Sequence, residues 1–258
     1  MKFLTFFISL LLISSCSKEQ FQNGRKSISD TFDTYQSLDD IKASKEPNFN
    51  FFQISERYPD NKINIDSTIS LSPKNAVHCF AKATKDGDAS KAGIANNKLS
   101  LEEGEIVSIE ANYFISTDES INQLFLMDLE ESILIGAGPG IRLRLVGEKG
   151  YLNVERKKMG EGTLAQSKDK QVSFPRNQWV RIKLEVKLSQ KKNGWIKVYQ
   201  DGVLIIESTE ERTLPIDRLT YNQGTKGIYN SIQLGITANT SDRDLDLYLD
   251  DIELTLIQ

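Results

Sequence analysis

The sequence contains few of the residues that metal sites and covalent cross-links require. Among its 258 residues are one histidine and two cysteines. These numbers leave little room for a structural zinc site and none for a disulfide framework. Cationic residues are also in the minority, because 32 Lys and Arg face 36 Asp and Glu and give a formal net charge of −4. Nucleic acid is therefore a poor candidate partner, since neutralising phosphate needs a basic surface.

The rest of the composition is that of a soluble globular chain. Hydrophobic residues make up 39% and charged residues 26% of the sequence, which excludes a polytopic membrane protein and a wholly disordered chain. The length suits one large β domain or, less easily, two small domains.

The first sixteen residues resemble the export signal of a bacterial lipoprotein. A basic start at Met1-Lys2 precedes an apolar run over residues 3–13, and a small residue, Ser15, precedes Cys16. Eleven apolar-rich residues are too few to span a bilayer but suit the core of a signal peptide. The resemblance implies cleavage after residue 15, a diacylglycerol thioether on Cys16 and usually an acylated amino terminus, for example with palmitate. An ordinary secretory leader that happens to include Cys16 is the alternative.

Lipidation would give the protein a firm anchor, because several acyl chains hold a protein at a membrane where one does not. Ser17 rather than an aspartate follows Cys16, which in such lipoproteins favours the outer membrane over the inner one. We therefore expect an envelope lipoprotein, with the side of the membrane that it faces left open. Residues 16–27 read as the lipidated cysteine and a polar, flexible tether, and residues 28–258 as the folded domain. Cys79 would then be the only thiol, so no intrachain disulfide is expected.

Most of the folded part shows the period-two alternation of half-buried strands. Residues 76–83, 106–116, 180–188, 195–200, 231–238 and 245–254 alternate apolar and polar side chains. Asp201-Gly202 lies between two such runs and is a strong hairpin signal. Residues 28–75 are less regular and predict a first strand, a long connection and a second strand near residues 63–69. We expect ten or eleven strands, no amphipathic helix longer than three turns, and an antiparallel sandwich or barrel.

Two blocks of sequence resemble the concanavalin A-like lectin and glucanase superfamily. Residues 177–186 and 193–202 (NQWVRIKLEV and NGWIKVYQDG) look like its strand-and-hairpin motif, and residues 247–254 (LYLDDIEL) look like its closing strand. Within the superfamily the chain looks closest to the jelly-roll polysaccharide lyases, the group with glucuronan and heparin lyases. The resemblance covers about residues 60–258. It implies an all-β jelly-roll sandwich of two curved antiparallel sheets, with carbohydrate lying across the concave sheet.

The hydrolase branch of this superfamily is disfavoured. Its laminarinase-like members carry an E-x-D-x-E triplet on one strand, and the nearest segment here is residues 126–130 (LMDLE). Asp128 and Glu130 would share a face, but Leu126 occupies the nucleophile position. Retaining hydrolysis needs two carboxylates that flank the glycosidic bond, so a retaining glycosidase is not expected.

A lyase needs a base beside the uronate carboxylate, and a tyrosine can protonate the leaving oxygen. The resemblance to glucuronan-type lyases, which carry a catalytic histidine on an early strand, makes His78 the candidate base, with Tyr221 or Tyr229 beside it. Neither the Q-I/V-H nor the R-T-E-x-R motif of alginate lyases occurs. A lone strand histidine is, by the alternative interpretation, a polar surface or packed residue.

Several other side chains are candidates for binding an acidic glycan. Arg142 and Arg144 share a face and could hold carboxylate or sulfate groups bidentately. Lys82 shares the polar face of His78, and Trp195 and Tyr199 could stack on sugar rings. The alternative for the arginines is a solvated face with partners such as Glu155 or Glu185, and for the aromatic residues a place at the edge of the core. The aspartates at 242, 244, 246, 250 and 251 also leave a structural calcium open, although their spacing is not that of an EF-hand.

Together these features predict an envelope-anchored lipoprotein that binds or degrades polysaccharide. The preferred hypothesis is a polysaccharide lyase that acts on an acidic glycan by β-elimination. The alternative is a non-catalytic surface lipoprotein that binds carbohydrate or a protein partner.

Overall fold

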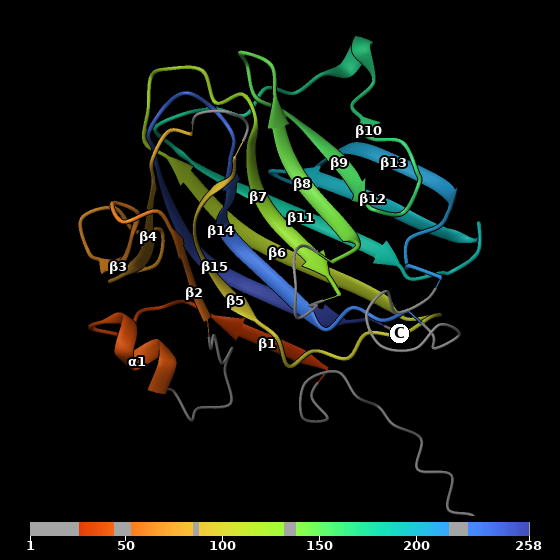
Figure 1. The fold of residues 1–258 in the computed structure, drawn as a ribbon, viewed down its shortest axis with the longest axis horizontal. Helices are drawn as coiled ribbons and strands as arrows, with labels where there is room; N and C mark the ends of the chain where they lie inside the picture. The colour runs from red at the N-terminus through yellow and green to blue at the C-terminus, as the bar shows by residue number, and fades with distance from the viewer. Residues whose placement is uncertain (1–25, 44–52, 85–87, 132–137, 217–226, 258) are drawn as a thin grey trace, which may run out of the picture.

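The computed structural model describes residues 26–43, 53–84, 88–131, 138–216 and 227–257. Its strands form two antiparallel sheets that pack face to face, with one sheet in front of the other in Figure 1. The described part of the chain also holds one short helix, α1 (Leu38–Ala43), and one 3-10 turn at Lys168–Lys170. No helix among these residues is long and apolar enough to cross a membrane.

One sheet has eight strands. In spatial order they are β13 (Val203–Glu211), β12 (Gly194–Gln200), β11 (Trp179–Lys187), β6 (Ile106–Ile115), β15 (Leu245–Leu256), β4 (Ala76–Ala81) and β3 (Lys62–Asp66), and β1 (Ser27–Asp30) pairs with the far end of β15. The first and last strands of the described chain therefore lie side by side.

The other sheet has seven strands. In order they are β10 (Leu164–Ala165), β9 (Tyr151–Lys157), β8 (Gly140–Val146), β7 (Leu124–Glu130), β14 (Ser231–Asn239), β5 (Ser90–Asn96) and β2 (Gln53–Arg57). Strands β7 to β10 pair in chain order, whereas β14 lies between β7 and β5 because the chain crosses between the sheets. The expected all-β jelly-roll sandwich is confirmed.

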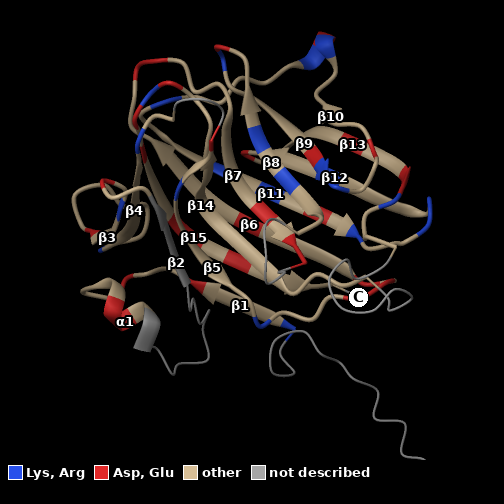
Figure 2. Cartoon of the chain, viewed as in Figure 1, with Lys and Arg blue, Asp and Glu red and all other residues tan. Residues whose placement is uncertain are grey.

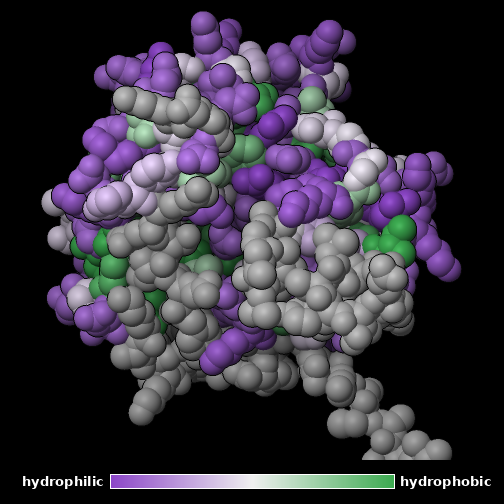
Figure 3. Space-filling model, in the orientation of Figure 1, coloured by the Kyte–Doolittle hydropathy of each residue, from purple (hydrophilic) through white to green (hydrophobic). Residues whose placement is uncertain are grey.

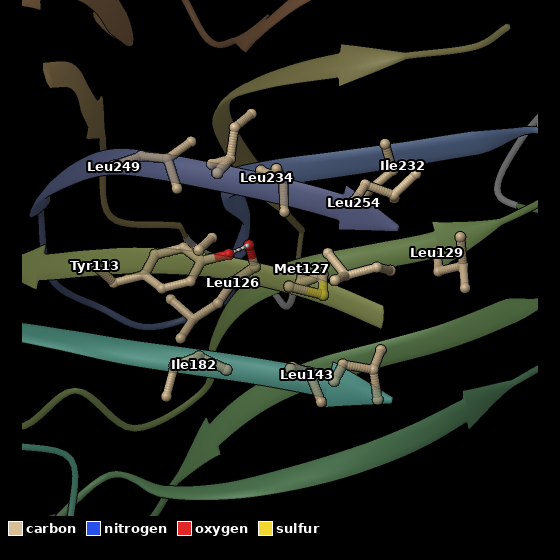
Figure 4. Close-up of a cluster of buried hydrophobic side chains, with 14 of the residues drawn as sticks. Tyr113, Leu126, Met127, Leu129, Leu143, Ile182, Ile232, Leu234, Leu249 and Leu254 are labelled. Carbon is tan, nitrogen blue, oxygen red and sulfur yellow. Dashed lines mark hydrogen bonds between the residues drawn. The ribbon is translucent and has the colours of Figure 1, made fainter. Parts of the chain in front are cut away.

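Apolar side chains at every second position of the long strands form the core between the sheets. In β11, Val180, Ile182, Leu184 and Val186 are fully buried, and the residues between them face outward. The same pattern in β4 buries Val77, Cys79 and Ala81. Figure 4 shows apolar side chains of the two sheets meeting, with the Tyr113 hydroxyl donating a hydrogen bond of 3.2 Å to the Leu126 carbonyl oxygen. This bond satisfies the one polar group that Tyr113 brings into the core.

The hairpin expected at Asp201-Gly202 is confirmed, and both residues have positive φ (49° and 81°), as a two-residue turn of this kind requires. The strand count was underestimated, because fifteen strands occur in the described residues. Residues 28–75 contribute to three of them, β1, β2 and β3. Short edge strands with little alternation, such as β10, leave almost no periodic signal.

Strand β15 contains a bulge with a partly buried carboxyl group, that of Asp251. The register with β6 shifts between Asp250 and Glu253, and Asp251 lies there with a φ of 41°. Burial, with help from the nearby charges of Asp250 and Asp33, raises the pKa of Asp251 to about 6. The folded state therefore holds this proton more tightly than the unfolded chain, whose carboxyl titrates near 3.8. Stability contributed by the neutral form is present below about pH 4 and is lost as the pH rises through about 6.

Replacing this carboxyl by an amide should stabilise the protein at neutral pH. Asparagine tolerates a positive φ, so Asp251→Asn removes the charge without straining the bulge. After a discount for partial exposure, we expect a gain of about 1 kcal/mol, or roughly 2–4 °C in Tm. Thermal melts at pH 4 and pH 7 test this: the gain should appear at pH 7 and vanish at pH 4. Equal gains at both values would contradict the pKa argument.

Candidate functional site

The outer face of the seven-stranded sheet carries a set of charged residues that is unusually well buried. We call it the charged face; it consists of Lys91, Asp128, Glu130, Arg142, Arg144, Glu155 and Lys157. Alternation places them there, since Ile141, Leu143 and Leu145 of β8 fill the core while the arginines between them point outward. Figure 2 shows basic residues on β8 next to acidic residues on β7. Figure 3 shows hydrophilic side chains over the described middle of this face.

A row of alternating charge crosses three neighbouring strands of this sheet. Arg142 of β8 lies opposite Asp128 of β7 on one side and Glu155 of β9 on the other. Its Nε is 3.1 Å from Asp128 Oδ1, and its Nη1 is 3.8 Å from Glu155 Oε2. The Thr237 hydroxyl from β14 donates a second hydrogen bond, of 3.0 Å, to Asp128 Oδ1. Asp128 is only 1% exposed, so these contacts replace the water that its charge has lost.

A second row lies one step along the strands. Lys157 of β9 reaches across Gly140 of β8 and forms an ion pair with Glu130 of β7. Gly140 suits this position, because an added Cβ would lie 2.4 Å from the Leu129 carbonyl oxygen. The Gln233 amide donates a further hydrogen bond of 2.6 Å to Glu130 Oε1. Lys157 and Glu130 are 9% and 6% exposed, so both charges depend on each other for compensation.

Arg144 differs from Arg142 because it retains an unused donor. It lies between Phe125 of β7 and Asn153 of β9, with its guanidinium carbon 5.8 Å from the centre of the Phe125 ring. Its Nε is buried and has no hydrogen-bond partner among the described residues. Guanidinium donors that the protein leaves unused can bind a carboxylate. Arg144 is therefore the group on this face best suited to bind an acidic ligand.

Lys91 supplies a group with the character of a base. Its neighbours Ala92 and Ile94 fill the core, so its side chain leaves β5 on the outer side of the sheet. Burial lowers the pKa of Lys91, and the cations Lys157 and Arg142 lower it further, while Asp128 and Glu130 oppose the shift. A lysine whose pKa is lowered holds more of the neutral amine that can accept a proton.

The structure separates the site residues that the sequence suggested. Arg142 and Arg144 lie on the charged face. The other described candidates lie on the eight-stranded sheet or directly beside its strands, and they face outward on the opposite side of the sandwich. They are His78, Lys82, Trp195 and Tyr199. The one-site hypothesis for His78, Arg142 and a tyrosine is therefore corrected. Tyr221 and Cys16 lie outside the described residues.

Tyr229 is corrected from a catalytic candidate to a core residue. Its side chain is fully buried, and its hydroxyl donates a hydrogen bond of 2.7 Å to the Thr213 carbonyl oxygen. Burial raises the pKa of Tyr229 above its ordinary value. A tyrosine in this position cannot contact a glycan or release its proton to one.

His78 and Lys82 have structural partners on their own face. His78 Nε2 is 2.7 Å from Asp246 Oδ1, its Nδ1 is 3.1 Å from Asn64 Oδ1, and its ring stacks on Tyr248 with a centroid separation of 4.5 Å. Lys82 Nζ is 2.7 Å from Asp244 Oδ2. These contacts agree with the alternative interpretation, in which the strand histidine is a packed polar residue.

Three of the five aspartates considered for calcium have partners within the fold. Besides the contacts of Asp244 and Asp246, Asp250 Oδ2 accepts hydrogen bonds from the backbone amides of Leu71 and Ser72 at 2.8 and 3.0 Å. The described residues contain no group of three or more His, Cys, Asp or Glu side chains that could hold a metal ion.

Sequence reasoning recognised only part of the charged face. The pairing of Asp128 and Glu130 on one face was expected and is confirmed, although Leu126 lies in the core because the register shifts between Phe125 and Met127. Glu155, which the alternative interpretation gave as a partner of the arginines, contacts Arg142, whereas Glu185 lies on the other sheet. Lys91 and Lys157 were missed. Lys91 lies between Ser90 and Ala92, and Lys157 lies in the run Arg156-Lys157-Lys158, so in the sequence neither differs from an ordinary surface lysine.

Comparisons with known proteins agree with this architecture. A family model described as "Polysaccharide lyase" matches residues 52–253, whereas no curated protein sequence matches the chain. Among solved structures, the chain is similar to an endo-beta-1,4-glucuronan lyase from the fungus Trichoderma reesei, with a TM-score of 0.59 and 11% identity over 80% of this chain and 90% of that one.

Two further solved structures share the fold. The cellulose induced protein Cip1 gives a TM-score of 0.57 and 15% identity over 88% of this chain and 96% of its own. The alginate lyase Aly36B gives 0.56 and 12% over 90% and 98%. Identities this low show a common fold and leave substrate open. The family model, in contrast, covers well over half of the sequence, and this chain therefore belongs to the polysaccharide lyase family.

Proposed function

We propose that this protein cleaves an acidic polysaccharide by β-elimination on the charged face. The observation that carries the proposal is the arrangement of Arg144 and Lys91 around a buried, internally paired set of charges. One is a guanidinium with a free donor, and the other is a lysine whose pKa burial lowers. Membership of the polysaccharide lyase family and the glucuronan and alginate lyases among the structural neighbours support the same reaction class.

Arg144 and Lys91 have different roles in the proposed reaction. A uronate carboxylate bound by Arg144 loses part of its negative charge, which acidifies the proton on the adjacent ring carbon C5. The neutral amine of Lys91 takes that proton, the C–H electrons form the C4–C5 double bond, and the bond from C4 to the glycosidic oxygen breaks. The leaving oxygen then takes a proton, for which the new Lys91 ammonium is a donor on the same face. The products are an unsaturated uronide and a new sugar end.

The paired residues give this site its rigidity. Asp128, Arg142 and Glu155 hold one another, as do Glu130 and Lys157, so little reorganisation is needed when substrate binds. Asp128 and Glu130 also place negative charge near Lys91, and burial, with a smaller effect from Lys157 and Arg142, still lowers the pKa of Lys91.

An assay for new unsaturated uronide tests the function. The full-length chain is extracted from membranes with detergent and incubated with alginate, glucuronan, heparin and pectin while ultraviolet absorbance is followed. We expect absorbance to rise with at least one of these substrates and Arg144→Ala to lower the rate about a hundredfold, because an electrostatic contact to developing charge is lost. Lys82→Ala, on the opposite face, is the matched control.

Two other outcomes would change the assignment. Absence of absorbance together with retarded migration in a gel that contains one of these glycans would indicate a non-catalytic binding lipoprotein. Recovery of the protein in the soluble rather than the membrane fraction would count against the outer-membrane lipid anchor that we propose at Cys16 from the lipoprotein-like residues 1–16.

A further inference from the structure

A polar hollow lies on the outer face of the eight-stranded sheet, on the opposite side of the sandwich from the charged face. Two adjoining spaces of about 430 and 230 Å³ make it up, and both are lined by Glu110 and Arg181. The hollow crosses β1, β15, β6 and β11 and ends at the turn between β12 and β13. We define the polar hollow by Glu110, Asn112, Arg181, Lys183, Tyr199 and Asp251.

A row of aromatic rings borders this hollow. Trp179, Phe114, Tyr248 and His78 lie directly opposite one another on β11, β6, β15 and β4. The ring centroids are 5.7, 5.9 and 4.5 Å apart along the row. Arg181 and Asn112 are each two residues from the ring on the same strand, so the hollow is the next row of the same face.

Tyr199 provides an aromatic wall at the other end of the hollow. Lys183 Nζ lies 4.8 Å from the centre of the Tyr199 ring and 2.7 Å from Glu185 Oε1, which holds the ring beside the polar groups. Aromatic rings beside hydrogen-bonding side chains are what a pyranose requires, because its C–H face packs on a ring while its hydroxyl groups bond in the plane.

The hollow also offers groups for hydroxyl recognition. Arg181 Nη1 is 3.6 Å from Glu110 Oε1, and the Arg181 side chain is 54% exposed, so it has free donors. Asp251 Oδ1 is buried at the edge of the hollow with no hydrogen-bond partner among the described residues. An unused acceptor of this kind is satisfied by a hydroxyl donor from a ligand.

The charge of the hollow selects against an acidic chain. Four carboxylates line the two spaces, from Asp30, Glu110, Asp251 and Glu253, against the two cations of Arg181 and Lys183. A polyuronate would meet a net negative surface here, whereas sugar hydroxyl groups can donate to the carboxylates and accept from the cations.

We propose that the polar hollow is a second saccharide-binding site that takes an uncharged polysaccharide. The protein would then hold a neutral glycan on one side of the sandwich and cleave an acidic glycan on the other. Such an arrangement would keep the enzyme within a mixed matrix, because two separate contacts raise the effective concentration of the second partner.

Affinity electrophoresis of the full-length chain tests the site, with laminarin, xyloglucan or hydroxyethyl cellulose in the gel. We expect at least one of them to retard the protein and Tyr199→Ala or Arg181→Ala to raise the apparent Kd about tenfold. Trp195→Ala removes an aromatic ring from the same face outside the hollow and should leave the retardation unchanged. Formation of unsaturated uronide should be unaffected in all three variants, which separates this site from the charged face.

Three results would overturn the proposal. They are an absence of retardation in every neutral glycan, an equal loss in Trp195→Ala and Tyr199→Ala, and a loss of neutral-glycan binding in Arg144→Ala. The last result would place all binding on the charged face. Thermal melts of each variant show whether a loss of glycan binding reflects unfolding instead. Arg181→Ala should perturb folding least, because the Arg181 side chain is exposed.

Discussion

Replacing Lys91 by alanine should lower the rate of β-elimination by about 10²–10⁴-fold, the usual contribution of a general base, while the protein stays folded. The reason is that Lys91 is the lysine on the charged face whose pKa burial lowers. Its side chain is only partly buried, so truncation leaves no large cavity. The measurement is the initial rate of unsaturated uronide formation at saturating substrate.

The pH profile and a conservative variant distinguish a base from a simple positive charge. Because the neutral amine is the active form, the rate should rise with pH up to the pKa of Lys91, which lies below its ordinary 10.5. Lys91→Arg keeps the charge but cannot lose its proton at these values, so it should be as inactive as alanine. Substantial activity in Lys91→Arg would show that only the charge matters.

His78→Ala is the matched control on the opposite sheet. Its ring packs on Tyr248 and its two nitrogens face Asn64 and Asp246, so its removal should leave the lyase rate nearly unchanged. A loss comparable to that of Lys91→Ala would return the catalytic role to the histidine and contradict the site described above.

Glu130→Gln should strongly destabilise the protein. It removes the charge that forms an ion pair with Lys157, which is 9% exposed. Breaking a buried pair from one side costs about 3–5 kcal/mol because the remaining charge is left without compensation. Chemical denaturation of the wild type and the variant measures this difference in the free energy of unfolding.

A double variant tests whether the uncompensated charge of Lys157 causes the loss of stability. Lys157→Met in the Glu130→Gln background removes the orphaned ammonium and should recover most of the stability, since an apolar group can replace a buried pair. Asp128 Oδ2 lies 3.8 Å from Lys157 Nζ and gives it some remaining compensation, which limits the loss in the single variant. If the two single changes were simply additive, the two residues would not be coupled.

The two layers of the fold could be predicted because the cause is local. In β11 every second residue is apolar, so burying one set leaves the other outside whatever partner the strand has. The turn at Asp201-Gly202 is similarly encoded by residues that accept positive φ. Strands β1, β2 and β10 are too short for a clear periodic signal, and they form because longer neighbours offer unpaired backbone groups.

Which residues form the site depends on contacts between distant parts of the chain. Alternation shows that His78 and Arg142 both face outward, but it does not show that β4 and β8 belong to different sheets. Lys91 and Arg142 are 51 positions apart, and they come near each other because β5, β14, β7 and β8 are neighbours in one sheet. Tyr229 was a catalytic candidate in the sequence, and only packing shows that its hydroxyl bonds inside the core.

The sequence by itself determined the fold class, the inward and outward face of each long strand, and the sharing of one face by Asp128 and Glu130. These depend on the period of the backbone and on burying apolar side chains. Tertiary structure alone decided which outward faces became one surface, because strand order is set by long-range pairing. It also decided the lowered pKa of Lys91 and the unused donor of Arg144, since both arise from burial and from neighbours on other strands.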